Sequence, residues 1–329
     1  MKNNYNLIDI IWKKILISDI IKVEMEKYMK KEILIIVNPC AGKGKVSKYI
    51  PQICDNLEKQ GCELEVVYTS QNKNGQQIIE NYIRYIDAVI VCGGDGTLNE
   101  VINGIINCHK RIDVTFIPFG TTNDFAKTVK IPRNRYGLSK NLIKYKRLNI
   151  DVGKFENRYF YYVAAFGLCT KVSYATSQKE KNKYGKLAYY KHGIKELKNI
   201  KTFKTSIVTD NEIIKDEFIY GSITNSISIG SIKWFKRNDV KVNDGLFEIL
   251  LVKKPKNILG YLKIAISILS KKYDQKNIYY LKSKHMQIDF EEGVDWTLDG
   301  EFGGNLNHII IENNQKRIGL LVPKKGGKK

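Results

Sequence analysis

Three glycines surround a single carboxylate in one short run, Gly93-Gly94-Asp95-Gly96, which precedes a predicted helix. Glycines at the end of a strand remove side chains, so that backbone N–H groups can approach a phosphate closely. The helix that follows directs its positive end at the same place. A carboxylate there is costly unless it orients a divalent metal, a water molecule or an acceptor hydroxyl. The run therefore predicts phosphate chemistry, and a simple glycine turn is the alternative.

Two other loops have a composition that suits phosphates. Residues 38–45 combine glycines with two lysines, without the spacing of a Walker P-loop. Residues 118–126 offer hydroxyls, an amide and a carboxylate at the start of a helix, where Asn123 or Asp124 could also be an N-cap. Three such loops at neighbouring strand ends predict one shared phosphate site.

Short apolar runs alternate with helical patterns through the first half of the chain. Parallel strands need such crossovers, and the ligands of parallel sheets lie beyond the carboxyl ends of the strands. This order predicts an α/β fold with a parallel-sheet nucleotide-binding domain. The predicted strands are 33–37, 64–68, 88–92 and 114–118, and the predicted helices are 47–60, 76–86 and 98–106.

Beyond residue 150 the pattern changes to short β-rich segments separated by turn residues. This spacing predicts a second, mainly antiparallel domain, most simply a β-sandwich. Helices are expected near 186–198 and 256–269, and we expect the latter to cover a sheet rather than to lie on a membrane. The predicted boundaries are an N-terminal extension over 1–30, the α/β domain over 31–150, the β-rich substrate domain over 151–322 and a basic tail over 323–329.

The chain is strongly basic. Lys and Arg number 55 against 34 for Asp and Glu, which gives a formal net charge of +21. Nucleic acid, an anionic lipid surface and nucleotide phosphates all suit this charge, and general lysine-rich usage explains it equally well. The six cysteines lack metal-ligand spacing, which favours a reduced cytosolic protein.

No apolar run approaches the length needed to cross a bilayer. Residues 7–21 have the pattern of a basic amphipathic helix that lies on a membrane surface. An ordinary solvent-facing helix is one alternative. The other is that the true initiator is Met25 or Met29, so that these residues precede the start of the protein.

Further motifs complete the set of candidate functional residues. They are Asn38-Pro39, Gly93-Gly-Asp-Gly-Thr-Leu-Asn-Glu100, Gly120-Thr-Thr-Asn-Asp-Phe125, Asp151-Val-Gly-Lys154, Asn225-Ser226, Asn243-Asp-Gly-Leu246 and Leu298-Asp-Gly-Glu-Phe-Gly-Gly304. Together they resemble the diacylglycerol kinase catalytic family, which includes sphingosine and ceramide kinases, and most of all the soluble bacterial diacylglycerol kinases. The resemblance extends over about residues 31–322.

The resemblance implies catalytic roles for four carboxylates. Glu301 is expected to be the catalytic base, with Asp299 as the next choice. The network around Asp95 and Asp124 is expected to carry the catalytic Mg²⁺. ATP is expected to contact Asn38, Pro39, Cys40, Ala41, Gly42, Thr69, Gly94, Asp95, Gly96, Thr97, Leu98, Asn99, Glu100 and Thr121.

The resemblance also implies a structural Mg²⁺ in the second domain. Its expected ligands are the Asp244 side chain and main-chain oxygens near Lys241 and Leu246. The chain departs from the family pattern here, because Asn243 stands where a second carboxylate is common. Lys127 likewise replaces a frequent arginine, and Cys40-Ala41 replaces hydroxyl side chains.

The expected function is an ATP-dependent lipid kinase that converts diacylglycerol to phosphatidic acid. Its expected partners are ATP, Mg²⁺, the lipid and an anionic membrane surface, and no nucleic acid. Attachment to the inner face of the cell membrane from the cytoplasm is expected, and a homodimer fits the resemblance. The alternatives are a kinase of sphingoid bases, monoacylglycerol or undecaprenol, an NAD kinase, and a basic binding protein without catalysis. The Asn123-Asp124-Phe125 loop and the Asp299-Gly-Glu301 element favour the lipid kinase over an NAD kinase.

Overall fold

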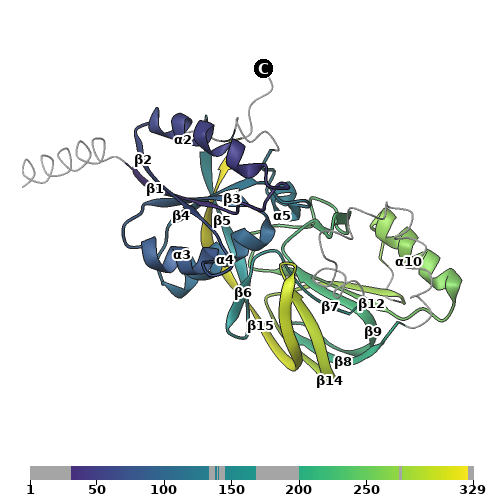
Figure 1. Cartoon of the computed structure of the whole chain (residues 1–329). Helices are drawn as coiled ribbons and strands as arrows, with labels where there is room; N and C mark the ends of the chain where they lie inside the picture. The colour runs from purple at the N-terminus through teal and green to yellow at the C-terminus, as the bar shows by residue number, and fades with distance from the viewer. Residues whose placement is uncertain are drawn as a thin grey trace, which may run out of the picture.

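The computed structural model describes residues 31–132, 138, 140, 145–167, 200–273 and 276–324. The described strands form one thirteen-stranded sheet and a separate two-stranded hairpin, with helices at both ends of the molecule (Figure 1). The helices predicted over 7–21 and 186–198, and most of the basic tail, lie outside the described residues.

The first half of the chain contains four strands that pair in parallel. They are β1 Lys31–Val37, β2 Cys62–Tyr68, β3 Ala88–Gly93 and β4 Asp113–Pro118. β1 lies between β2 and β3, and β3 pairs with β4. The side chains of β3 and β4 are almost all buried because helices cover both faces, whereas those of β2, at the edge of the sheet, alternate in burial. The strands lie where the sequence predicts them.

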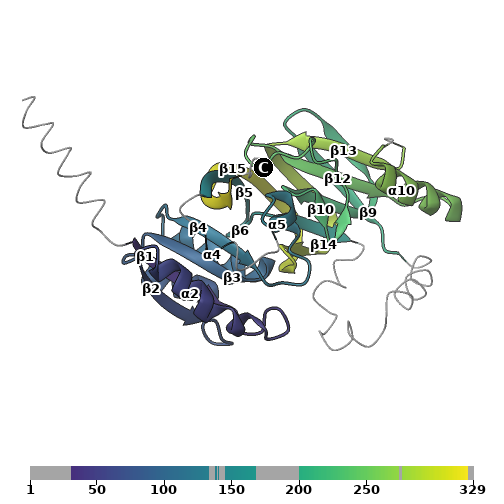
Figure 2. The ribbon, with the colours of Figure 1, turned by 90° about the horizontal axis from the view of Figure 1, so that it is seen from above.

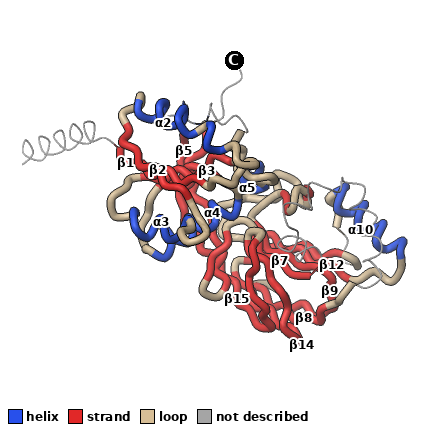
Figure 3. Tube along the Cα trace, viewed as in Figure 1, coloured by secondary structure: helices blue, strands red, loops and turns tan. Residues whose placement is uncertain are grey.

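Three crossover helices connect these strands, and Figure 3 shows α2 on one face of the sheet with α3 and α4 on the other. α3 begins with a capping box, in which Asn74 and Gln77 exchange side chain to backbone hydrogen bonds at 3.0 Å. α4 packs closely on α3 at Gly104, where a Cβ would lie 3.0 Å from the Gln76 carbonyl. The bounds are α2 Ile50–Glu58, α3 Gly75–Tyr82 and α4 Asp95–Asn107, with a 3-10 helix η1 at Val46–Lys48 and a short α5 at Asp124–Thr128.

The second half is built from antiparallel strands. They are β5 Tyr145–Phe155, β6 Arg158–Phe160, β7 Val163–Gly167, β8 Phe203–Thr209, β9 Ile213–Thr224, β10 Ser228–Ile229, β11 Ile232–Lys233, β12 Phe247–Lys253, β13 Ile278–Ser283, β14 His285–Leu298 and β15 Glu301–Pro323. β15 pairs antiparallel with β14 and β5, and near its end it pairs in parallel with β4. This one long strand therefore joins both halves of the chain into a continuous sheet.

The antiparallel region differs from the expected two-sheet sandwich, because its sheet closes on itself. β9 and β14 each pair with β7 at one end and with β8 at the other. The enclosed core is aromatic: the ring centroid of Phe166 lies 4.9 Å from that of Phe290 and 5.0 Å from that of Trp296. Strands as long as β9 and β14 can bend around such a core, and the sequence pattern alone does not reveal that they share both partners.

Helix α10, Ile258–Ser270, follows β12 and lies at the end of the molecule opposite α2 and α3 (Figures 1 and 2). The Asn257 side chain caps it by accepting from the backbone N–H of Gly260 at 3.0 Å. The helix forms where the sequence predicts one. Within the described ranges, no helix has the length and apolar character needed to cross a membrane.

Candidate active site

The glycine turn between β3 and α4 packs against the loop that follows β4. Gly94 is the N-cap of α4 and Asp95 is its first residue, so the helix begins at the turn itself rather than at residue 98. A Cβ on Gly120 would lie 2.8 Å from the Gly94 Cα and 2.6 Å from Asn123 Oδ1. Only glycine fits at this position, because a side chain would separate the two loops. Two of the predicted phosphate loops therefore touch through their backbones.

The loop after β1 is tied to the same turn by Asn38. Its Nδ2 donates to Thr97 Oγ1 at 3.0 Å, and its Oδ1 accepts from the backbone N–H of Cys40 at 3.0 Å. Its own backbone N–H donates to the carbonyl of Cys92 at 3.0 Å. Pro39, Ala41 and Gly42 are half-buried in this loop. All three predicted phosphate loops thus meet at the carboxyl ends of β1, β3 and β4.

Asp299 joins the second half of the chain to α4. Its side chain is buried, and Oδ1 accepts from the backbone N–H groups of Tyr162 at 3.0 Å and Val163 at 2.8 Å. Oδ2 accepts from the Tyr161 backbone N–H at 3.1 Å and from Asn99 Nδ2 at 2.6 Å. Burial raises the pKa of Asp299 to about 6, against the opposing effect of these hydrogen bonds. Four donors occupy the carboxylate, which suits a positioning residue better than a base.

Glu301 lies two residues further on, at the start of β15, and approaches the glycine turn. Its side chain is exposed, and a Cβ on Gly96 would lie 3.4 Å from Glu301 Oε1. Gly96 follows Asp95 in the first turn of α4. Glu301 and Asp95, which are far apart in the sequence, therefore lie at the same turn.

Asp95 has one carboxylate oxygen without a hydrogen-bond donor. Thr122 Oγ1 donates to Oδ2 at 3.4 Å, whereas Oδ1 is buried and has no hydrogen-bond partner in the part of the chain that the structure describes. Burial raises the pKa of Asp95 to about 7, and the nearby charges of Asp124 and Asp299 add to the increase. A buried carboxylate oxygen of this kind is suited to a cation.

Asp124 accepts from donors on both halves of the chain. Oδ1 accepts from Lys127 Nζ at 2.8 Å and Ser228 Oγ at 3.0 Å, and Oδ2 accepts from Tyr162 Oη at 3.0 Å and the Ser231 backbone N–H at 2.8 Å. Burial by itself raises the pKa of Asp124, but the hydrogen bonds from Lys127 and Ser231 outweigh it and leave the pKa below its usual value. With four donors in place, the geometry favours a positioning role for Asp124 over the predicted contact with Mg²⁺.

For four other residues predicted to contact ATP, the structure shows no side-chain hydrogen bond to the glycine turn among the described residues. Glu100 Oε2 accepts from the Gly75 backbone N–H at 2.8 Å and so caps α3. The Leu98 side chain is fully buried, which leaves only its backbone near the turn. Thr69 follows β2 and donates its backbone N–H to the β1 carbonyl of residue 37 at 2.9 Å. Thr121 is exposed in the loop after β4.

The residues predicted for a structural metal lie in a separate loop before β12. Asp244 Oδ1 accepts from the Leu246 backbone N–H at 3.2 Å. The loop is held by Asp151, whose carboxylate accepts from the backbone N–H groups of Gly245 and Lys316, each at 2.7 Å. Among the described residues there is no group of three or more His, Cys, Asp or Glu side chains that could hold a metal. Any metal here would depend on main-chain oxygens.

Two tyrosines at the site were missed by sequence reasoning. Tyr161 Oη donates to the Asp95 carbonyl at 2.9 Å, and its ring meets Phe125 edge to face with centroids 4.6 Å apart. Tyr162 Oη donates to Asp124. Both precede β7, and the only sequence signal is their position just after the β5–β6 hairpin. Their hydrogen-bond partners lie 66 and 38 residues away in the chain, where no local pattern connects them.

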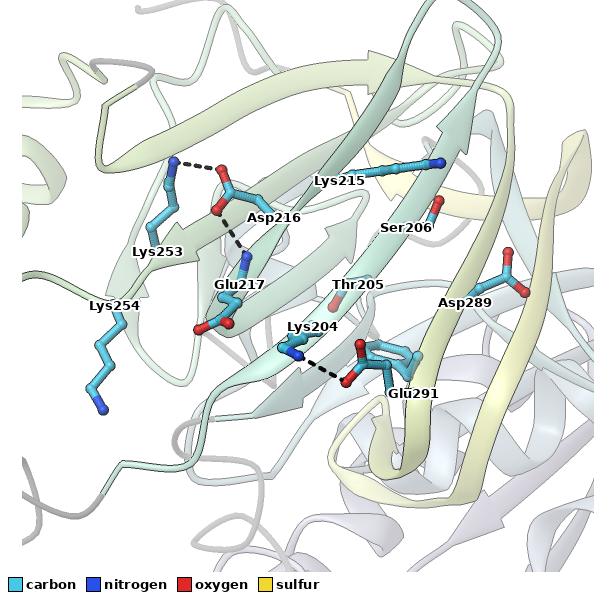
Figure 4. Close-up of a pocket in the computed structure, with 11 residues that line it drawn as sticks. Lys204, Thr205, Ser206, Lys215, Asp216, Glu217, Lys253, Lys254, Asp289 and Glu291 are labelled. Carbon is cyan, nitrogen blue, oxygen red and sulfur yellow. Dashed lines mark hydrogen bonds and ion pairs between the residues drawn. The ribbon is translucent and has the colours of Figure 1, made fainter.

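A hollow of about 760 Å³ lies elsewhere, over β8, β9, β12 and β14 (Figure 4). Four lysines and four acidic residues line it, so their charges cancel. Some of them pair directly: Lys253 Nζ lies 2.5 Å from Asp216 Oδ2, and Lys204 Nζ lies 3.4 Å from Glu291 Oε2. None of the residues predicted for the site lines this hollow.

Known proteins are similar to this chain in sequence and fold. The family described as diacylglycerol kinase catalytic domain matches residues 32–155. The diacylglycerol kinase of Bacillus subtilis (strain 168) is 30% identical over 297 residues, which are 89% of this chain and 97% of the relative. That of Staphylococcus haemolyticus (strain JCSC1435) is 33% identical over 301 residues, 90% of this chain and 89% of the relative. The crystal structure of a diacylglycerol kinase from Bacillus anthracis str. Sterne superposes with a TM-score of 0.70 at 26% identity, covering 89% of this chain and 97% of that one.

The chain has a parallel α/β half joined to an antiparallel half, with carboxylates from both at one turn, and its similarity to these proteins shows that it is a lipid kinase. The chain belongs to the diacylglycerol kinase family. It is therefore a phosphotransferase of lipid metabolism, as the motifs predict.

Proposed function

We propose that this chain transfers the terminal phosphate of ATP to the primary hydroxyl of diacylglycerol at a membrane surface, which gives phosphatidic acid. The observation that carries the proposal is that the turn before α4 and the turn between β14 and β15, which ends at Glu301, lie next to each other. The Gly93–Thr97 turn ends a parallel strand and begins α4, and Glu301 Oε1 lies 3.4 Å from the Cβ position of Gly96 within it. The names of the relatives support the choice of diacylglycerol.

In this proposal the three loops after β1, β3 and β4 hold the ATP phosphates. The first N–H groups of α4 have no partner within the helix and point toward the turn, as at other helix N-termini that bind anions. Asn38 supports the turn through Thr97. The lipid hydroxyl oxygen attacks the γ-phosphorus, and the bond between that phosphorus and the ADP oxygen breaks. Glu301 accepts the hydroxyl proton as the new P–O bond forms.

The residues present fit a Mg²⁺ ion beside the phosphates. Asp95 Oδ1 is a buried carboxylate oxygen without a hydrogen-bond donor among the described residues, and oxygen is the ligand that Mg²⁺ prefers. Asp95 would hold the ion, whose chemistry is to offset the negative charge of the β- and γ-phosphates. Asp299 and Asp124 position the surrounding backbone and do not contact it.

A second Mg²⁺ at Lys241, Asp244 and Leu246 stays a prediction. The donor set is one carboxylate with main-chain oxygens, which suits a hard cation. The Asp151 carboxylate is already used by two backbone N–H groups, so the site depends on Asp244 for its charge.

The proposal also includes the location of the enzyme in the cell, its oligomeric state and its alternative acceptors. We expect it to act from the cytoplasm on the inner face of the membrane, because its net charge of +21 favours anionic headgroups. A homodimer stays a prediction. Sphingoid bases, monoacylglycerol and undecaprenol are the alternative acceptors, and NAD is a more distant one.

Transfer of radiolabelled phosphate from ATP into a panel of acceptors tests the proposal. The panel contains diacylglycerol, monoacylglycerol, sphingosine, undecaprenol and NAD, with the lipids in mixed micelles and the products identified by chromatography. We expect Mg²⁺-dependent formation of phosphatidic acid as the fastest reaction. Faster phosphorylation of another acceptor would replace diacylglycerol, and transfer to NAD alone would overturn the proposal.

A further inference from the structure

The outer face of α10 is apolar and exposed. Leu259, Leu262, Ile266 and Leu269 are 63%, 58%, 55% and 80% exposed. They lie three or four residues apart, which places them in one stripe along the helix. The opposite face packs inward, where Ile264 is buried. Packing of Ile264 into the core explains the inner face of α10, and it leaves the outer stripe without a function.

Lysines surround this stripe. Residues 254–272 contain five lysines and no acidic residue. The lysines are Lys254 and Lys256 before α10, Lys263 within it, and Lys271 and Lys272 after it, and all but Lys271 are exposed. An aliphatic stripe bordered by cations is the composition of helices that lie in the interface of an anionic bilayer.

The end of α10 is connected to the site. Tyr273, just beyond the helix, donates its hydroxyl to the carbonyl of Trp234. Trp234 directly follows the β10–β11 hairpin, and Ser231 of that hairpin donates its backbone N–H to Asp124. The same hairpin carries an exposed Ile232. A surface bound to α10 would therefore lie near an element that borders the site.

We propose that α10 is the element that seats this enzyme on an anionic lipid bilayer. Leu259, Leu262, Ile266 and Leu269 enter the boundary between headgroups and acyl chains, and the surrounding lysines bind anionic headgroups. This inference deepens the proposed function and rests on it for the membrane as the source of substrate, but binding to the bilayer needs neither ATP nor catalysis. A second copy of the chain fits the stripe less well, because a two-fold contact would place the same lysines against one another.

Sedimentation of the full chain with vesicles measures the binding. The vesicles contain equal amounts of phosphatidylglycerol and phosphatidylcholine, and phosphatidylcholine alone is the neutral comparison. The test variant is Leu262→Glu with Ile266→Glu. The matched control is Val208→Glu with Ile213→Glu, because these are also exposed aliphatic residues and change the charge equally, on the β8–β9 hairpin.

We expect the test variant to lower the partition coefficient on the order of 100-fold, about one tenfold step for each aliphatic side chain removed from the interface. The control should bind like the parent chain, and added salt should weaken the binding of both. Leu262→Trp provides a second measurement that keeps the stripe apolar. The fluorescence of the introduced indole should shift to the blue with anionic vesicles, and brominated acyl chains should quench it.

Equal binding by the test variant and the parent, or no quenching of the indole in the Leu262→Trp variant, would overturn the role of α10. A dimer of the parent that the test variant loses, with vesicle binding unchanged, would assign the stripe to a second copy instead. A different result would refute the proposed function. If the parent binds vesicles through α10 but phosphorylates no lipid in micelles, the docking inference stands and the lipid kinase assignment for this chain falls.

Discussion

Replacing Asp299 by asparagine should change how the stability of the protein depends on pH. The pKa of Asp299 is about 6 in the folded chain against a reference value of 3.8. A difference of about 2 units corresponds to about 3 kcal/mol. Because the folded-state pKa is raised, this contribution to stability is fully present below a pH of about 3.8. It is lost as the pH rises through about 6.

Asparagine cannot ionise, so the Asp299→Asn variant lacks this pH dependence. The free energy of unfolding of the variant minus that of the parent should rise by about 3 kcal/mol between a pH of about 3 and a pH of about 7. The difference between the two proteins isolates Asp299, since the other carboxylates titrate in both. Urea unfolding at several pH values measures it, with Asp295→Asn, near the end of the preceding strand, as the control.

The activity of the same variant separates positioning from catalysis. Asparagine replaces one acceptor oxygen with a donor that faces two N–H groups, so the turn before Glu301 should shift and turnover should fall. The base remains, and the pH profile of the remaining activity should keep the shape of the parent's. The reasoning is refuted if the stability difference is flat with pH. It is equally refuted if Asp299→Asn removes the acidic limb of the rate profile, where a carboxylate base gains activity by losing its proton, while Glu301→Gln does not.

Three further predictions concern the same site. Glu301→Gln should lower turnover by a factor of roughly 10²–10⁴. It should change the free energy of unfolding by less than about 0.5 kcal/mol, because the side chain is exposed. Glu312→Gln is the control, and near-normal turnover of Glu301→Gln would show that Glu301 is not the base. Asp95→Asn should abolish the increase in melting temperature that Mg²⁺ gives the parent, and an undiminished increase would place the ion elsewhere. Gly120→Ala should destabilise the chain by about 2 kcal/mol or more, because the Cβ would lie 2.8 Å from the Gly94 Cα; a melting temperature equal to the parent's would show that the loops are not in contact.

The sequence predicts those parts of the fold that have a local signal. The buried runs at β1, β3 and β4 are continuous and apolar, and each ends in a glycine-rich or polar loop. Because parallel strands align their carboxyl ends, the meeting of these loops follows from the strand order alone. The resemblance then adds Glu301, whose turn carries no distinctive local pattern.

The contacts between the two halves could not be predicted in this way. Asp124 is buried because Tyr162, Ser228 and Ser231 reach it from segments that follow much later in the sequence. The sequence assigns Asp124 to the Mg²⁺, and a positioning role can be proposed for it only when these donors are known. The closed sheet around Trp296 depends similarly on β9 and β14 sharing both neighbours, which is a property of strand pairing rather than of hydrophobic period.

A crystal structure of the full chain with a non-hydrolysable ATP analogue and Mg²⁺ tests most directly whether both halves form one phosphoryl-transfer site. We predict that the γ-phosphate lies at the Gly93–Thr97 turn, with the metal on Asp95 Oδ1 and Glu301 facing the phosphorus from the opposite side. A nucleotide bound away from that turn, or a γ-phosphate that Glu301 cannot approach through a lipid hydroxyl, would contradict it.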